Sequence, residues 1–180
     1  GINRPVRCTI NPEVILGEEA HTSMKVNKPV NVVVIGGGTA GLEAACTAAE
    51  VGCTTFLFEA KPYLGGLARE IAKLPAKDRI NDFPDYLINR AKKLRNLYIF
   101  TNTTATMEAI ENLKPDVVVN ATGSTPLLPP IAGLHDRVDK EDSKVLSIFG
   151  LINNIEKFNE MDLEGKKIAV IGGGAVGLDV

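Results

Sequence analysis

The sequence predicts an α/β fold, in which a parallel sheet is flanked by helices and followed by the start of a second unit of the same kind. The run VNVVVI at 30–35 indicates a strand buried on both faces of a parallel sheet, because nearly all of its residues are β-branched and apolar. A glycine-rich turn and an alanine-rich, helix-forming stretch follow directly, in GGGTAGLEAACTAAE. The design recurs at the end of the chain, where IAVIGGGAVGLDV occupies 168–180.

The first of these repeats is part of a βαβ unit. The stretch AGLEAACTAAEVG suits a helix packed closely on a sheet, and Gly52 is a suitable C-terminal stop. A second short strand is expected in TTFLFEA at 54–60. Strand, tight turn, helix and strand in this order predict a right-handed crossover between parallel neighbours.

The elements that follow are expected to complete the first sheet and to lead into the second unit. Residues 104–114 are compatible with either a strand or a helix. The other expected elements are an irregular loop with a turn of helix (61–82), a helix (82–96), a strand (97–102), a strand ending in a loop (116–123), a proline-rich crossing (126–142), a helix within 143–160, and a strand and turn from 166. The predicted domains are a connector at 1–28, a sheet domain at 29–142, and a linker helix with the first strand and turn of another domain at 143–180.

Composition excludes several functional classes. The 180 residues carry a formal net charge of −2 with scattered basic residues, which indicates no nucleic-acid partner. The apolar runs are shorter than a membrane helix requires, and no charged-then-apolar leader opens the sequence. The three cysteines show no disulfide pattern, so a reducing, cytoplasmic location is expected.

The first glycine turn has the spacing of a dinucleotide site. Gly36, Gly38 and Gly41 occupy the G-x-G-x-x-G positions, which serve a sharp turn, close approach of a pyrophosphate, and close packing of helix on strand. Unpaired N–H groups at the start of the following helix would face the phosphates. Glu59 closes the second strand, where an acid accepts hydrogen bonds from ribose hydroxyls and favours a free 2′-OH. A purely structural glycine turn is the alternative, but strand, helix and acid together favour the dinucleotide.

The segment DVVVNATGSTP resembles the second fingerprint of two-dinucleotide flavoproteins, in which a strand ends in A-T-G beside the flavin. RCTINPEVILGEE at 7–19 and LGGLAREIAKLPAK at 64–77 are similar to segments of the 2,4-dienoyl-CoA reductase, 2-enoate reductase and trimethylamine dehydrogenase family. The resemblance implies a Rossmann-like FAD-binding domain followed by the start of a Rossmann-like NAD(P)-binding domain. It covers nearly the whole chain but only a middle part of such an enzyme.

The resemblance also assigns cofactor contacts. FAD would lie against the first turn, Glu59, the loop after it and the A-T-G segment, and NAD(P)H against the second turn. The implied FAD contacts are Gly36, Gly38, Thr39, Ala40, Gly41, Glu59, Ala60, Lys61, Gly66, Leu67, Lys77, Ala105, Ala121, Thr122 and Gly123, and the implied NAD(P)H contacts are Gly172, Gly174 and Gly177. A surface role for Lys77 stays equally open, and Leu67 stands where the family often has a polar residue.

Further cofactors are implied only for the full-length protein. Cys8 corresponds to the last cysteine ligand of the family's 4Fe-4S cluster, which needs four thiolates and so three more cysteines upstream. FMN would be bound by an upstream barrel. No residue of this chain is expected to act as a catalytic acid or base, and the isolated fragment is expected to be inactive. A homo-oligomeric full-length protein is compatible with the resemblance.

The remaining reactive residues favour simpler roles. Cys46 and Cys53 fit a packed core. Disulfide reductases carry a cysteine pair just after the loop that corresponds to Gly65 and Gly66 (the GG loop), but residues 67–76 contain no cysteine. His21 and His135 lack metal-ligand spacing and suit solvent-facing positions. Two functions stay open: an electron-transfer module that passes electrons from NAD(P)H through FAD to a cluster and FMN, reducing an enoate or enoyl-CoA substrate, or a non-redox ADP-binding module like that of trimethylamine dehydrogenase.

Overall fold

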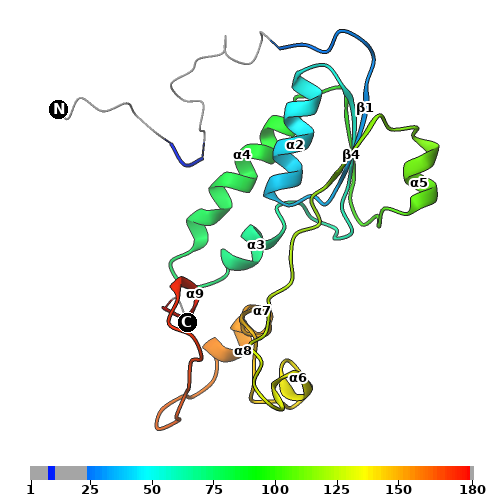
Figure 1. Cartoon of the computed structure of the whole chain (residues 1–180). Helices are drawn as coiled ribbons and strands as arrows, with labels where there is room; N and C mark the ends of the chain where they lie inside the picture. The colour runs from blue at the N-terminus through cyan, green and yellow to red at the C-terminus, as the bar shows by residue number, and fades with distance from the viewer. Residues whose placement is uncertain (1–7, 11–23, 179–180) are drawn as a thin grey trace, which may run out of the picture. The chain divides into compact units, whose positions relative to one another are not determined.

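The computed structural model describes residues 8–10 and 24–178, and the chain divides into two compact units between Ser124 and Thr125. Each unit is described by itself. In the first unit (Figure 1), strand β1 (Asn31–Ile35) leads into helix α2 (Thr39–Glu50), which returns to strand β2 (Thr54–Phe58). The two strands pair in parallel, with Val33 opposite Phe56, so the expected βαβ unit is present.

The rest of the first unit consists of short helices and two further strands. They are α3 (Leu67–Ile71), the 3₁₀-helix η1 (Asp78–Asn81), α4 (Asp82–Ala91), β3 (Leu97–Phe100), α5 (Met107–Asn112) and β4 (Val117–Asn120). The segment that was compatible with strand or helix becomes α5, because the Thr106 side chain accepts a hydrogen bond from the Ala109 N–H at 3.1 Å and caps the helix.

All four strands are parallel, in the order β3-β2-β1-β4. This arrangement confirms the predicted α/β fold with a parallel sheet flanked by helices. The chain crosses from β3 at one edge to β4 at the other, so the strand order reverses beside β1. In sheets of this kind, ligands bind beyond the carboxyl ends of the strands at the reversal point.

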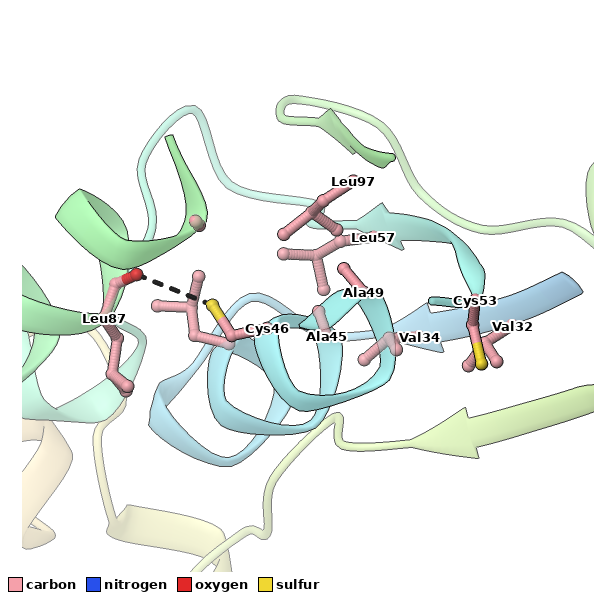
Figure 2. Close-up of a cluster of buried hydrophobic side chains, with 11 residues drawn as sticks. Val32, Val34, Ala45, Cys46, Ala49, Cys53, Leu57, Leu87 and Leu97 are labelled. Atoms are coloured by element: carbon pink, nitrogen blue, oxygen red, sulfur yellow. Dashed lines mark hydrogen bonds between the residues drawn. The ribbon is translucent and has the colours of Figure 1, made fainter. Parts of the chain in front are cut away.

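One face of the sheet carries the main core. Leu42, Ala45 and Cys46 of α2 pack against Val34 of β1 and Leu57 of β2, and all five are completely buried (Figure 2). Helix α4 closes this layer with Leu87 and Ala91. The alanines of α2 let the helix approach the strands closely, as their frequency in the sequence predicted.

The other face of the sheet carries α5 within the first unit. Ile110 packs with Val33 and Phe58, and the Phe58 ring stacks on Phe100 with centroids 5.1 Å apart. The outer positions of this face stay open to solvent, since Phe100 is 40% and Val118 of β4 is 47% exposed.

The second unit contains short helices joined by long stretches without regular structure where it is described. Its helices are α6 (Leu134–Arg137), α7 (Ile148–Asn153), α8 (Ile155–Asn159) and α9 (Ala175–Leu178). The helix expected within 143–160 is present as α7 and α8. Residues 166–174, all of them described, form no strand, and Ile168 and Ile171 are about 70% exposed. The described residues of this unit contain no other strand, so the expected one has no neighbour to pair with. None of the described helices is long and apolar enough to cross a bilayer.

Candidate functional site

The turn after β1 requires glycine at its first and last motif positions. Gly36 has φ of +104°, and a Cβ atom there would overlap the carbonyl oxygen of Ala121 and lie 2.7 Å from its carbonyl carbon. A Cβ at Gly41 would overlap the carbonyl oxygen of Gly36. These two glycines therefore bring α2 and the loop after β4 against the turn, a requirement of the protein's own packing.

At Gly38, by contrast, contacts within the protein do not require a glycine. Its backbone is extended (φ −70°, ψ −176°), and the nearest atom to a Cβ there would be the Cα of Gly66, at 3.9 Å. A side chain would therefore project into open space at the start of α2. No side chain caps α2, and its first helical turn holds no acidic residue. The N–H groups of that helical turn, where Thr39 and Ala40 lie, therefore suit an anion.

The Glu59 side chain lies at the same turn. Its Oε2 accepts a hydrogen bond from the Gly37 N–H at 2.6 Å, and its Oε1 accepts one from the Lys61 N–H at 2.7 Å. The carboxylate thus joins the end of β2 to the glycine turn. Ala60 and Lys61 follow at the surface.

A second glycine pair reaches the turn from the other side. The Gly65 N–H donates to the Gly37 carbonyl at 2.8 Å, and a Cβ at Gly66 would lie 2.8 Å from the Cα of Gly38. The backbone of the loop therefore lies directly against the open space at Gly38. Leu67 begins α3 and is 45% exposed, whereas Lys77 lies after α3, at the start of η1.

The A-T-G segment lies next to the first turn. The Ala121 N–H donates to the Ile35 carbonyl at 2.8 Å, and Asn120 Oδ1 accepts a hydrogen bond from the Thr122 hydroxyl at 2.9 Å. Gly123 has φ of +85° with open space around it. The first turn, Glu59, the GG loop and the A-T-G segment therefore meet at the carboxyl end of the sheet. Ala105 differs, because its side chain packs with the cluster under α5.

A charged cluster beside this site was not expected from the sequence. Glu70 of α3 is 7% exposed, and its carboxylate accepts hydrogen bonds from the Tyr63 hydroxyl and, at 2.7 Å, from Lys73 Nζ. Lys61 Nζ lies 3.5 Å from the same carboxylate. The hydrogen bonds from Lys73 and Tyr63 lower the pKa of Glu70 from 4.5 to about 2. The only sequence signal was the three-residue spacing of Glu70 and Lys73.

The second glycine turn belongs to the second unit. Gly172 has φ of +111°, and a Cβ at Gly177 would overlap the Gly172 carbonyl oxygen, as between Gly41 and Gly36. A Cβ at Gly174 would meet no atom within 4 Å. The local turn therefore repeats the first one, although no sheet supports it among the described residues.

The remaining candidate residues are the cysteines and histidines. Cys46 and Cys53 are buried, and burial raises the pKa of the Cys46 thiol to about 11, so it stays protonated. Cys8 is half-buried and His135 lies in the exposed part of α6, while His21 and most of 7–19 lie outside the described residues. In 8–10 and 24–178, no three His, Cys, Asp or Glu side chains gather as a metal site would require.

A family model supports the expected relationship. The model described as pyridine nucleotide-disulphide oxidoreductase matches residues 15–83 and 30–180. NADH oxidase of Thermoanaerobacter brockii is 36% identical over 98% of this chain and 26% of its own length. Cinnamate reductase of Clostridium sporogenes is 33% identical over 97% of this chain and 24% of its own length. The chain thus spans about a quarter of the length of these relatives.

Solved structures of oxidoreductases are also similar to this chain. A 2-naphthoyl-CoA reductase superposes with a TM-score of 0.65 and 27% identity, over 86% of this chain and 22% of its own. Histamine dehydrogenase from Rhizobium sp. 4-9 superposes with a TM-score of 0.56 and 27% identity, over 60% of this chain and 17% of its own.

Proposed function

Because the chain belongs to the pyridine nucleotide-disulphide oxidoreductase family, we propose that its first unit binds FAD within a longer, NAD(P)H-dependent flavoprotein oxidoreductase. The membership expected from the sequence, in the group of 2,4-dienoyl-CoA reductase and trimethylamine dehydrogenase, is confirmed by relatives and solved structures alike. The relatives are named oxidoreductases, so the family is one of redox enzymes.

The open space in front of Gly38 carries this proposal. Gly36 and Gly41 are explained by contacts within the protein, but the structure gives Gly38 no protein atom to avoid. A glycine there is explained when a bound group needs the volume that a side chain would take. Beside this space lie an uncapped helix N-terminus, which suits a diphosphate, and the Glu59 carboxylate, which suits ribose hydroxyls.

The remaining contacts of the proposed cofactor sites come from the loop after β2, the A-T-G segment and the second unit. Gly66 and the start of α3 would line the cofactor beyond the pyrophosphate, and the backbone at Ala121–Gly123 would border its flavin part. Leu67, Lys77 and Ala105 are peripheral members of the proposed site. In the second unit, Gly172, Gly174 and Gly177 would face NAD(P)H.

FAD supplies the redox chemistry when bound, since it accepts a hydride from NAD(P)H and releases electrons singly or in pairs. The part of this chain is to bind and orient the cofactor, and this role needs no catalytic acid or base. We place the receiving groups, a 4Fe-4S cluster with Cys8 as one ligand and FMN reducing an enoate or enoyl-CoA substrate, in the full-length protein. The cysteine pattern supports a cytoplasmic location.

The test is titration of the 180-residue chain with FAD and with ADP by calorimetry, using Gly38→Val. The variant should weaken binding of both by at least about tenfold, because the valine occupies the volume of the diphosphate. Thr47→Val, which places valine on the exposed side of the same helix, is the matched control and should bind normally. Equal affinity of Gly38→Val and the unaltered chain would remove the diphosphate from this space.

A non-redox ADP-binding module is the second candidate. The positioned groups, Glu59 and the turn at Gly38, all belong to the adenosine diphosphate half of the proposed site, and Leu67 offers no side-chain hydrogen bond to the rest. Equal affinities for ADP and FAD, with no flavin retained on purification, would favour this function. Clearly tighter binding of FAD would favour the flavoprotein.

A further inference from the structure

The loop at 60–66 joins the two sides of the proposed nucleotide site. At one end Glu59 is tied to the Gly37 N–H, and at the other the Gly65 N–H is tied to the Gly37 carbonyl, at 2.6 and 2.8 Å. Between these anchors the chain spans Ala60 to Leu64. The path of this span decides where Glu59 and Gly66 lie relative to each other.

The middle of the loop is attached to α3 through one buried carboxylate. Tyr63 donates its hydroxyl hydrogen to Glu70, and Lys61 Nζ lies 3.5 Å from the same group. Lys61 Nζ also lies 5.4 Å from the centre of the Tyr63 ring, a cation–π distance. Although burial lowers the pKa of Lys61, Tyr63 and Glu70 raise it overall, so the ammonium stays charged.

The position of Glu70 is unusual within the chain. Among the described residues, Glu70 and Thr55 are the buried polar or charged ones, and Glu70 alone is ionised. A buried carboxylate is tolerated where several donors surround it. Two of its three partners, the hydrogen-bonded Tyr63 and the ion-paired Lys61, come from the loop at 60–66, so the loop and the carboxylate stabilise each other.

We infer that Glu70 is a positioning residue for the nucleotide, holding the loop at 60–66 so that Glu59 and Gly66 keep the spacing that the cofactor needs. The inference rests on the proposed function, since it concerns the same site. Glu70 acts through Lys61 and Tyr63. The Lys61 N–H donates to Glu59 Oε1 at 2.7 Å, so a displaced Lys61 would turn the ribose-binding carboxylate as well.

The charges of the cluster fit this role. Glu70 is paired with Lys61 and Lys73, so the three side chains together carry one positive charge. A carboxylate beside a diphosphate would repel it if it were unpaired, but this pairing removes the repulsion and leaves the site attractive to an anion.

Replacing Glu70 by glutamine therefore distinguishes two ways in which the cluster could affect ADP binding. If the cluster acted only through its charge, removal of one negative charge near a diphosphate would strengthen ADP binding. If Glu70 holds the loop, Glu70→Gln should weaken ADP binding about tenfold, as expected when a charge-assisted hydrogen bond no longer orders a binding loop. The two explanations predict changes of opposite sign.

The experiment is an ADP titration of the unaltered chain, Glu70→Gln, Tyr63→Phe and the double variant, each also followed by thermal unfolding without ligand. Tyr63→Phe keeps the buried charge, so it tests the loop even if Glu70→Gln folds poorly. Glu50→Gln is the matched control, because Glu50 is also a largely buried carboxylate in an ion pair, with Arg90 on the core side of α2. It should lower thermal stability and leave ADP affinity unchanged.

The inference is supported if both single variants weaken binding and the double variant is no weaker than Glu70→Gln, since the two residues act as one unit. It is overturned if Glu70→Gln binds ADP as well as or better than the unaltered chain, or if Glu50→Gln loses as much affinity. Failure of the unaltered chain to bind ADP or FAD would instead overturn the proposed function, and the inference with it.

Discussion

At the residue scale, Gly41 and Gly38 of the first glycine turn should respond differently to the addition of a single methyl group. Gly41→Ala should lower the free energy of unfolding by about 2 kcal/mol, because its Cβ would overlap the Gly36 carbonyl oxygen and the backbone must shift. Gly38→Ala should change it by less than about 0.5 kcal/mol, since the backbone is extended and the space is open. Urea unfolding of both variants without ligand measures the difference, and equal losses would contradict this division of roles.

Sequence spacing located some of these residues and missed others for a physical reason. Glu59 could be predicted because motif, strand and acid lie at fixed distances along one βαβ unit. Glu70 could not be placed, because its contacts with Lys61 and Tyr63 depend on the path of an irregular loop. The motif assigned Gly36, Gly38 and Gly41 separate roles, and the surrounding atoms add that backbone atoms block a Cβ at Gly36 and Gly41 but not at Gly38.

At the scale of elements, one ion-pair network joins α2 to α4. The Arg90 side chain is 12% exposed, and its guanidinium lies 2.9 Å from Glu43 and 2.6 Å from Glu50. Its hydrogen bonds with Glu50 and then Glu43 raise the pKa of Arg90, so its charge is permanent. Because the pairs span two helices and sit beside the core, they should contribute to stability more than a surface pair does.

Arg90→Met should therefore lower the free energy of unfolding by about 2 kcal/mol, less than a fully buried pair would cost because Glu43 is 44% exposed. Arg90→Lys should recover only part of this loss, since an ammonium cannot bind both carboxylates in the same bidentate way. Urea unfolding at neutral pH is the measurement. A loss that disappears at high salt would show that the pairs behave as exposed ones.

Glu70 of helix α3 should make the stability of the first unit depend on pH in the acidic range. The pKa of Glu70 is lowered from 4.5 to about 2 in the folded state, so its contribution is fully present above pH 4.5 and is lost as pH falls through about 2. The stability difference between the unaltered chain and Glu70→Gln should therefore shrink as pH is lowered through this window. Thermal unfolding at several pH values between 5 and 2 tests it, and a constant difference would mean that Glu70 is not ionised in the fold.

Most elements of the first unit could be predicted because each carries a local signal. Val32–Ile35 is a continuous apolar run, and the alanines of α2 mark a closely packed helix. The segment at 104–114 was undecided, because the cap from Thr106 that selects a helix is a matter of side-chain geometry. The strand expected at 166–171 has the same local signal as β1 but stays unpaired, which shows that a buried strand needs neighbours as well as composition.

At the scale of the whole molecule, the parallel sheet followed from the βαβ pattern, but the order β3-β2-β1-β4 did not. The sequence contains no local signal for the crossing from β3 to the far side of β1, which depends on long-range pairing of Val33 with Val118. This crossing brings the A-T-G segment beside the first glycine turn. The site is therefore a property of the topology, although its residues are found by motif.

The two units should differ in their resistance to protease. Residues 161–174 are exposed throughout, including Lys166 and Lys167, whereas Arg69 and Arg90 lie in hydrogen-bonded parts of the first unit. Cleavage requires local opening, which is less costly where few apolar contacts are lost. Trypsin should therefore cut at Lys166 or Lys167 before it cuts between Arg69 and Arg90, as mass spectrometry of a digestion time course would show. ADP should slow the later cuts in the first unit and leave the early ones unchanged, because the proposed ADP site lies in the first unit, whereas no sheet supports the second glycine turn among the described residues. Equal protection of both regions would mean that the nucleotide stabilises the chain as one cooperative body.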